Sequence, residues 1–223
     1  MLRVVRSRDD AAAAGDLAAQ VVLGGMHYEG RGGAARDHAA ALAWARRGAA
    51  GHMIDGIFLV ATMNELGEGG LAAGGADGPR LYRIAAEAGH PVARYRLGVC
   101  YSKARGVQQD RAEAARHWRI AAELGWPPAQ ADMANSLIHG IGVEQNFAEA
   151  LRFAKMADAS GHPHGALHIG IMHHNGWGRA ADHTAGVKWL SKAARMGDEP
   201  SRQLLMGWAV GGDSESQAAL ARL

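Results

Sequence analysis

The sequence is poor in the features that mark secreted, membrane-spanning or nucleic-acid-binding proteins. Its 223 residues include one cysteine, so an intramolecular disulfide and a multi-cysteine metal site are excluded. No run of roughly eighteen apolar residues occurs, which argues against a membrane-spanning helix. The N-terminal stretch has no apolar segment of about seven residues before Asp9 and Asp10, so we do not expect a secretory signal. These absences favour a soluble cytoplasmic protein.

The chain also has little net charge and few aromatic residues. The formal net charge is +2, which is too small to indicate a nucleic-acid-binding surface by itself. Aromatic residues make up 6% of the chain, and there are only six prolines, most of which stand shortly after glycines, as in "GHP" and "GWPP". Prolines and glycines placed in this way are typical of many short helices separated by turns.

The sequence does contain a repeat with a period of 36 residues. Small and apolar residues recur together around each repeated glycine, so the period belongs to a structural unit rather than to one residue type. The glycines that define the period are Gly15 and Gly51, followed after a two-residue irregularity by Gly89, Gly125, Gly161 and Gly197.

Each unit divides into two expected helices joined by a glycine-containing turn. We call them helix A, for example residues 91–102, and helix B, which ends near the repeated glycine. Helix B is expected to begin at a side-chain cap, supplied by Asp37, Asp110, Asn146 or Asp182. It carries a large residue near its middle, which is Trp44, Tyr82, Trp118, Phe153 or Trp189. One hairpin cannot bury both of its helices, so neighbouring hairpins must stack.

The stretch from Ala93 to Asp110 reads A-x3-LG-x2-Y-x4-GV-x2-D and is followed by an aromatic residue and "AA-x2-G". This pattern resembles the Sel1-like repeat, a relative of the tetratricopeptide repeat. The resemblance implies an all-α fold, an α/α solenoid wound as a right-handed superhelix of about five helix-turn-helix repeats with C-terminal capping helices. The second unit departs from the pattern, with Thr62 in place of the glycine and Glu65 in place of the tyrosine.

We expect one repeat domain over residues 1–223. Its units are 16–51, 52–89, 90–125, 126–161 and 162–197, with a cap over 198–223.

Residues that could carry chemistry are better explained as structural. His164 and His168 are spaced i, i+4, as two metal ligands on one helix face would be, but no third ligand accompanies them. Cys100 lies within helix A beside Tyr101, which favours a structural thiol over a nucleophile. No nucleophile elbow or phosphate-binding loop occurs. We therefore predict no catalytic residue, no metal and no cofactor.

A basic cluster in the third unit leaves nucleic-acid binding open as an alternative. Helical spacing spreads its charges over several faces, which favours solvated charge. The cluster consists of Arg94, Arg96, Lys103, Arg105, Arg111, Arg116 and Arg119.

The similarity to tetratricopeptide arrays implies a concave wall formed by the A helices, and hence a non-enzymatic adaptor or scaffold that binds a peptide or protein there. A metal-dependent or cysteine enzyme and a basic nucleic-acid-binding solenoid are the alternatives, and no small-molecule substrate is expected. The expected partner-binding residues are Leu59, Met63, Tyr95, Val99, Lys103, Asn135, Ile138, His139, Leu167, Ile171, His174 and Asn175. Five of them are expected to form an exposed apolar track, namely Tyr95, Val99, Ile138, Leu167 and Ile171.

Overall fold

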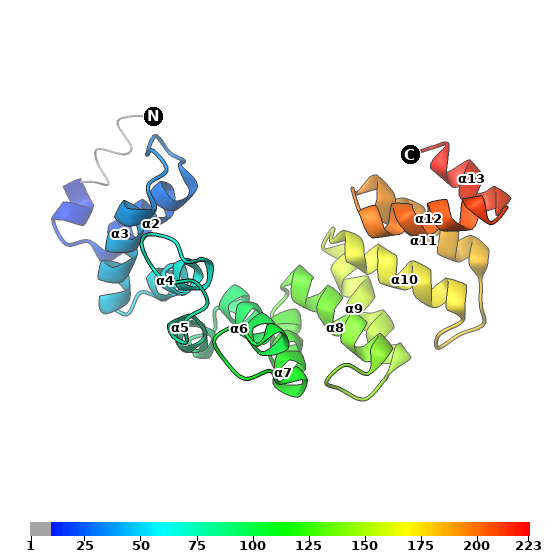
Figure 1. Cartoon of the computed structure of the whole chain (residues 1–223), viewed down its shortest axis with the longest axis horizontal. Coiled ribbons are helices and arrows are strands. Elements are labelled where there is room, and N and C mark those ends of the chain that lie inside the picture. Colours follow the sequence, from blue (N-terminus) through cyan, green and yellow to red (C-terminus); the bar gives the residue numbers. More distant parts are fainter. Residues whose placement is uncertain (1–9) are drawn as a thin grey trace. The chain divides into compact units, whose positions relative to one another are not determined.

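The computed structural model describes residues 10–223, which form helices and turns without a strand (Figure 1). The chain divides into two compact units, residues 1–110 and 111–223. The first contains α2 (Leu17–Glu29), α3 (His38–Ala50), α4 (Ile54–Leu66), α5 (Asp77–Glu87) and α6 (Pro91–Lys103). The second contains α7 (Arg111–Glu123), α8 (Pro127–His139), α9 (Phe147–Ala159), α10 (Pro163–Asn175), α11 (His183–Arg195), α12 (Glu199–Val210) and α13 (Ser214–Leu220).

Side-chain caps begin three of the B helices where the sequence predicts them. Asp37, Asn146 and Asp182 each accept a hydrogen bond from the backbone N–H three residues further on, at 2.9–3.0 Å. Such a bond satisfies one of the N–H groups that a helix start leaves without a partner. The side chain of Glu149, which has the spacing of a capping box with Asn146, instead forms an ion pair with Arg119.

The glycines of the 36-residue period close the B helices because their backbone is left-handed. Gly89, Gly125, Gly161 and Gly197 all have φ between 73° and 90°. A side chain at this φ is strained, so glycine is the residue that ends these helices at least cost. At the first boundary the left-handed residue is His52, with φ of 60°, rather than Gly51.

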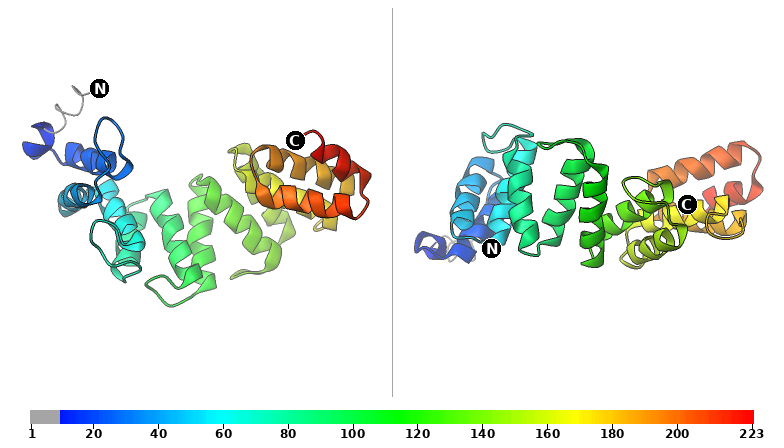
Figure 2. Two further views of the ribbon diagram at one scale, coloured as in Figure 1. Left: turned by 45° about the horizontal axis from the view of Figure 1, so that its top comes forward. Right: turned by 90° about the horizontal axis from the view of Figure 1, so that it is seen from below.

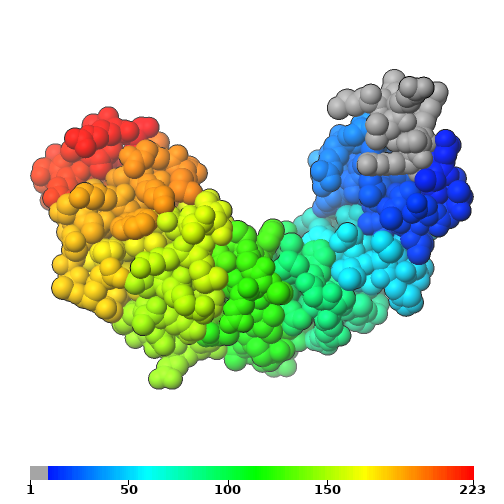
Figure 3. All heavy atoms as spheres, turned by 180° about the vertical axis from the view of Figure 1, so that it is seen from behind, coloured from blue at the N-terminus to red at the C-terminus, as the bar shows by residue number. Residues whose placement is uncertain are grey.

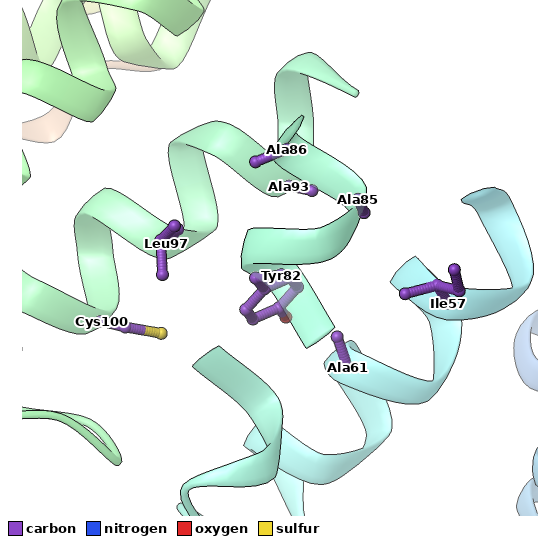
Figure 4. Packing of buried hydrophobic residues seen from close by; sticks show 8 residues of the cluster. All are labelled: Ile57, Ala61, Tyr82, Ala85, Ala86, Ala93, Leu97 and Cys100. Atoms are coloured by element: carbon purple, nitrogen blue, oxygen red, sulfur yellow. The ribbon is translucent and has the colours of Figure 1, made fainter. Parts of the chain in front are cut away.

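Successive helices of the first unit pack in order, as α2 on α3, α3 on α4, α4 on α5 and α5 on α6. They stand side by side in the right-hand view of Figure 2. Figure 4 shows part of the core, where Tyr82 of α5 lies between α4 and α6. Small residues, among them Ala61, Ala85 and Ala93, surround its ring and are at most 1% exposed. Alanines allow the backbones to approach, and the single large ring fills the space between them.

The second unit repeats this arrangement and adds the cap. Leu190 of α11 packs with Leu167 of α10 and Leu205 of α12, and α13 then packs on both α11 and α12. In Figure 3 the orange and red surfaces of these last helices adjoin one another.

The predicted all-α solenoid class is confirmed. The single domain over residues 1–223 stays a prediction, and residues 1–9 lie outside the described part of the chain. Within residues 10–223, no helix is both long enough and apolar enough to cross a membrane.

Small residues stand where helix A meets helix B of the same hairpin, as predicted. A Cβ atom added to Gly170 of α10 would lie 3.1 Å from the carbonyl oxygen of Gly186 and 3.0 Å from Cγ of Leu190, both in α11. Gly24 of α2 has the same relation to α3, 3.2 Å from the backbone nitrogen of Ala45. These contacts leave little room for a larger side chain.

Replacing Gly170 by leucine is therefore expected to overpack this contact and to lower the free energy of unfolding by about 1–3 kcal/mol. Gly207→Leu is the control, because a Cβ atom at Gly207 meets nothing within 4 Å and leucine favours the helix. Urea unfolding of both variants measures the difference. Equal stability of the two variants would contradict the close approach of α10 to α11.

Candidate functional site

The structure places the twelve predicted partner-binding residues in unequal surroundings. Eight are exposed or half-buried, which are Leu59, Tyr95, Lys103, Asn135, His139, Ile171, His174 and Asn175. The other four are buried, which are Met63, Val99, Ile138 and Leu167, with exposed fractions of 0%, 9%, 2% and 7%. The expectation of an exposed apolar track is therefore wrong for Val99, Ile138 and Leu167.

The reason is that an A helix packs on more than one neighbour. Met63 of α4 lies against Ala41 and Leu42 of α3, the B helix of the preceding hairpin. Leu167 packs with Leu190 of α11 in its own hairpin. His174 is also partly covered, because its ring stacks on Trp208 of α12 with the ring centroids 4.1 Å apart. Several positions that the repeat pattern assigns to the concave wall are thus used for packing.

A hollow with a mainly apolar lining lies in the first unit, where α2 and α4 pack against each other. We call it the α2–α4 groove. It has a volume of about 490 Å³, and its apolar lining includes Val21, Val22, Phe58 and Leu59. Val22 is 41% exposed. A Cβ atom added to Gly25 meets nothing within 4 Å, so the missing side chain at Gly25 helps to keep the groove open.

Aromatic and charged residues hold the walls of the groove in place. Phe58 stacks on the ring of His90 with a centroid distance of 4.5 Å, and His90 lies 3.6 Å from the carboxylate of Asp55. On the α2 side, Tyr28 stacks on His38 at 5.4 Å. Burial, together with the neighbouring Glu68, raises the pKa of Tyr28 to about 12, so its hydroxyl stays neutral at physiological pH. The groove is an apolar surface with a polar rim.

Of the predicted residues, only Leu59 lines the α2–α4 groove. In the later units the predicted residues lie three positions before, or one, four or five positions after, the small residue of helix A, as Tyr95, Val99 and Lys103 do around Gly98. Counted from Gly24, the positions three before and one, four and five after it are Val21, Gly25, Tyr28 and Glu29, and all four line the groove. The signal was present in the repeat, although the exposed Val22 falls outside it.

Four of the seven cations in the basic cluster of the third unit pair with carboxylates. Arg96 and Arg105 pair with Glu65, at 3.9 and 2.6 Å. Arg116 pairs with Glu113 at 2.8 Å, and Arg119 pairs with Glu149. Cations already held by carboxylates are poorly placed to contact phosphates, which favours the structural interpretation of the cluster.

Comparison with known proteins agrees with this geometry. The Sel1 repeat matches residues 17–52, 80–90, 91–126, 127–162 and 163–198, which is most of the chain. The chain belongs to the Sel1 repeat family. Repeats of this family are generally protein-interaction modules, and the Sel1 scaffold is typically non-catalytic. A search of curated proteins found no match.

Solved structures of bacterial proteins share the fold. A protective antigen of uropathogenic Escherichia coli strains that displays an SLR fold is 26% identical, with a TM-score of 0.85 over 98% of this chain. The chain spans 48% of the length of that structure. A Sel1 repeat protein from Oxalobacter formigenes is 21% identical, with a TM-score of 0.81 over 97% of this chain and 95% of the other. An immunity protein from Pseudomonas aeruginosa is 19% identical, with a TM-score of 0.53 over 89% of this chain and 75% of the other.

The second Sel1 repeat departs most from the pattern, and its buried carboxylate explains how it still packs. Glu65 replaces the tyrosine of helix A, and its side chain is only 4% exposed. It accepts a hydrogen bond from the hydroxyl of Tyr82 at 2.8 Å and pairs with Arg105.

Burial, with Glu65 nearby, raises the pKa of Cys100 to about 12. A thiol held in this way is a poor nucleophile, which supports a structural role.

The histidines of the fifth Sel1 repeat are dispersed into separate contacts. His164 lies 3.2 Å from the carboxylate of Asp198, and His174 Nδ1 lies 2.9 Å from His183 Nδ1. In residues 10–223 no three histidine, cysteine or acidic side chains are arranged to hold a metal ion. Burial, reinforced by nearby His164 and His139, lowers the pKa of His168 from 6.5 to about 4.

Glu65→Ala is expected to lower the free energy of unfolding by about 1–3 kcal/mol, because the buried Tyr82 hydroxyl loses its carboxylate acceptor. The control is Glu29→Ala, which removes an ion pair with Arg31 whose side chains are 47% and 69% exposed. An exposed pair contributes less than about 1 kcal/mol. Urea unfolding measures both variants, and similar losses in the two would argue against a structural role for the Glu65 network.

The low pKa of His168 predicts a loss of stability in mild acid. As the pH falls from about 6.5 to about 4, the unfolded chain takes up a proton at His168 while the folded chain does not. Protonation therefore favours unfolding in this window. Between pH 7 and pH 5 the parental protein should lose about 1–2 kcal/mol more stability than His168→Asn. Urea unfolding at the two pH values tests this, and parallel profiles would show that folding does not disfavour protonation of His168.

Proposed function

We propose that the chain is a non-enzymatic adaptor that binds a peptide or a protein segment on the exposed face of its A helices. In this proposal the α2–α4 groove takes the central apolar side chain of the partner. The observation that carries the proposal is a groove of about 490 Å³ that is lined by apolar residues and left uncovered in the described chain. Apolar surface of this kind typically marks an interaction site on a protein.

The shape of the groove supports a helical or extended protein segment as the ligand. It lies between α2 and α4, the A helices of two successive repeats. Amphipathic helices dock in grooves of this kind in other proteins. The stacked pairs of Phe58 with His90 and Tyr28 with His38 hold both walls, so little ordering is needed on binding. A few residues at the centre of the groove should therefore supply most of the binding energy.

Five of the other predicted residues extend the proposed surface within each unit. Tyr95 and Lys103 belong to α6, and Asn135, His139 and Asn175 belong to α8 and α10. All five are exposed or half-buried and stay candidates for contact with the partner. A cytoplasmic location is part of the same proposal, because the single cysteine is buried and free, as suits a reducing compartment.

Val22→Asp tests the proposal, because it places a charge in the α2–α4 groove without entering the core. We expect the variant to lose its partner while its helical content and melting temperature stay close to those of the parent. The measurement is affinity purification of the tagged full chain from its own cells, followed by mass spectrometry.

Ile84→Asp is the matched control, since Ile84 belongs to α5, lies outside the groove and is also 41% exposed. A photoreactive phenylalanine analogue at Gly25 should in addition crosslink directly to the recovered partner. The proposal fails if Val22→Asp and Ile84→Asp retain the same partners and the crosslink is not formed. Ile138→Asp would be unsuitable as a test, because Ile138 is only 2% exposed and the charge would be buried.

A further inference from the structure

A second hollow lies in the other unit, between α11 and the last capping helix α13. Figure 2 shows α13 in red beside the orange helices of the same unit. We call this hollow the α11–α13 groove. It has a volume of about 310 Å³, and Val187, Ala218 and Ala219 give it an apolar floor. It contains none of the predicted partner-binding residues.

Three cations surround this floor. Lys188 and Arg195 of α11 and Arg222 beyond the end of α13 line the groove and are exposed. Among residues 10–223 none of the three has an ion-pair partner, whereas Lys192 of the same helix pairs with Asp158 at 2.5 Å. The long stems of lysine and arginine can cover apolar surface while their charged ends stay at the rim.

The one carboxylate that lines the α11–α13 groove is already engaged. Glu215 of α13 accepts a hydrogen bond from the hydroxyl of Thr184 in α11 at 2.9 Å. This bond links the two walls, and the lining holds three cations against this single carboxylate. The groove therefore carries an excess of positive charge above an apolar floor.

We propose that the α11–α13 groove binds an acidic segment of a partner protein. Carboxylates of the segment pair with Lys188 and Arg195, and an apolar side chain between them rests on Val187. Arginine and lysine form strong charge-assisted hydrogen bonds with carboxylates. The groove has no aromatic side chain on which a base could stack, so a protein segment fits better than a nucleic acid.

This surface is separate from the α2–α4 groove, because it lies in the other unit and is built from a B helix and a capping helix. The chemistry of the α11–α13 groove also differs, since it favours a ligand that carries negative charge as well as an apolar side chain. The two proposals can therefore fail independently. A variant of one groove should leave binding at the other unchanged.

The test uses the full chain and fluorescein-labelled synthetic peptides in which glutamates flank one leucine, with anisotropy as the readout. Lys188→Glu with Arg195→Glu is the groove variant. The control is Lys155→Glu with Arg202→Glu, which has the same net charge and alters exposed cations outside the groove. We expect the parent and the control to bind. The groove variant should bind at least about tenfold more weakly, because two charge-assisted contacts are lost.

A basic peptide with lysine in place of glutamate should not bind, and a DNA duplex of mixed sequence should bind more weakly than the acidic peptide. Equal losses in the groove and control variants would overturn the proposal, as would no binding by the parent or preferred binding of the duplex. Lys188→Gln with Arg195→Gln supplies the same comparison if the charge-reversed protein does not fold, and parental affinity in that variant would also overturn the proposal.

Discussion

The close approach of helix A to helix B at one small residue is the contact on which the rest of this protein depends. At Gly24 and at Gly170 a Cβ atom would already lie within 3.2 Å of the partner helix. Because the backbones touch there, each hairpin is narrow, and a single large side chain such as Tyr82 or Phe153 can fill the space around it. Stacking of such hairpins is what leaves hollows between neighbouring A helices.

A consequence of this packing is that an imperfect repeat must compensate locally. The second repeat has a glutamate where the pattern has tyrosine, and a buried carboxylate without partners would be strongly destabilising. The Tyr82 hydroxyl and Arg105 provide those partners for Glu65. The compensation preserves the packing of α4 against α5 and α6, and α4 provides one wall of the α2–α4 groove.

Pairing of charges also distinguishes structural surfaces from candidate binding surfaces. Four of the six arginines that look like a basic patch in the sequence are held by carboxylates, as Arg119 is by Glu149. The cations around the α11–α13 groove lack such partners among the described residues. The two proposed surfaces thus differ in kind, since one offers apolar area with stacked walls and the other offers unpaired charge. An adaptor with both would recognise two chemically different segments.

The repeat period, the caps and the closing glycines are local features, and the sequence by itself determined them. Asp37, Asn146 and Asp182 act within a few residues of their own position, and glycine supplies the left-handed residue at every B-helix end but the first. Which A-helix residues remain exposed was decided only by the tertiary structure. An A helix contacts its own B helix, the preceding B helix and at some positions the next A helix, so a single periodic offset cannot separate core from surface. Ile138 and Met63 became core for this reason, while Val22 stayed exposed beside the open space at Gly25.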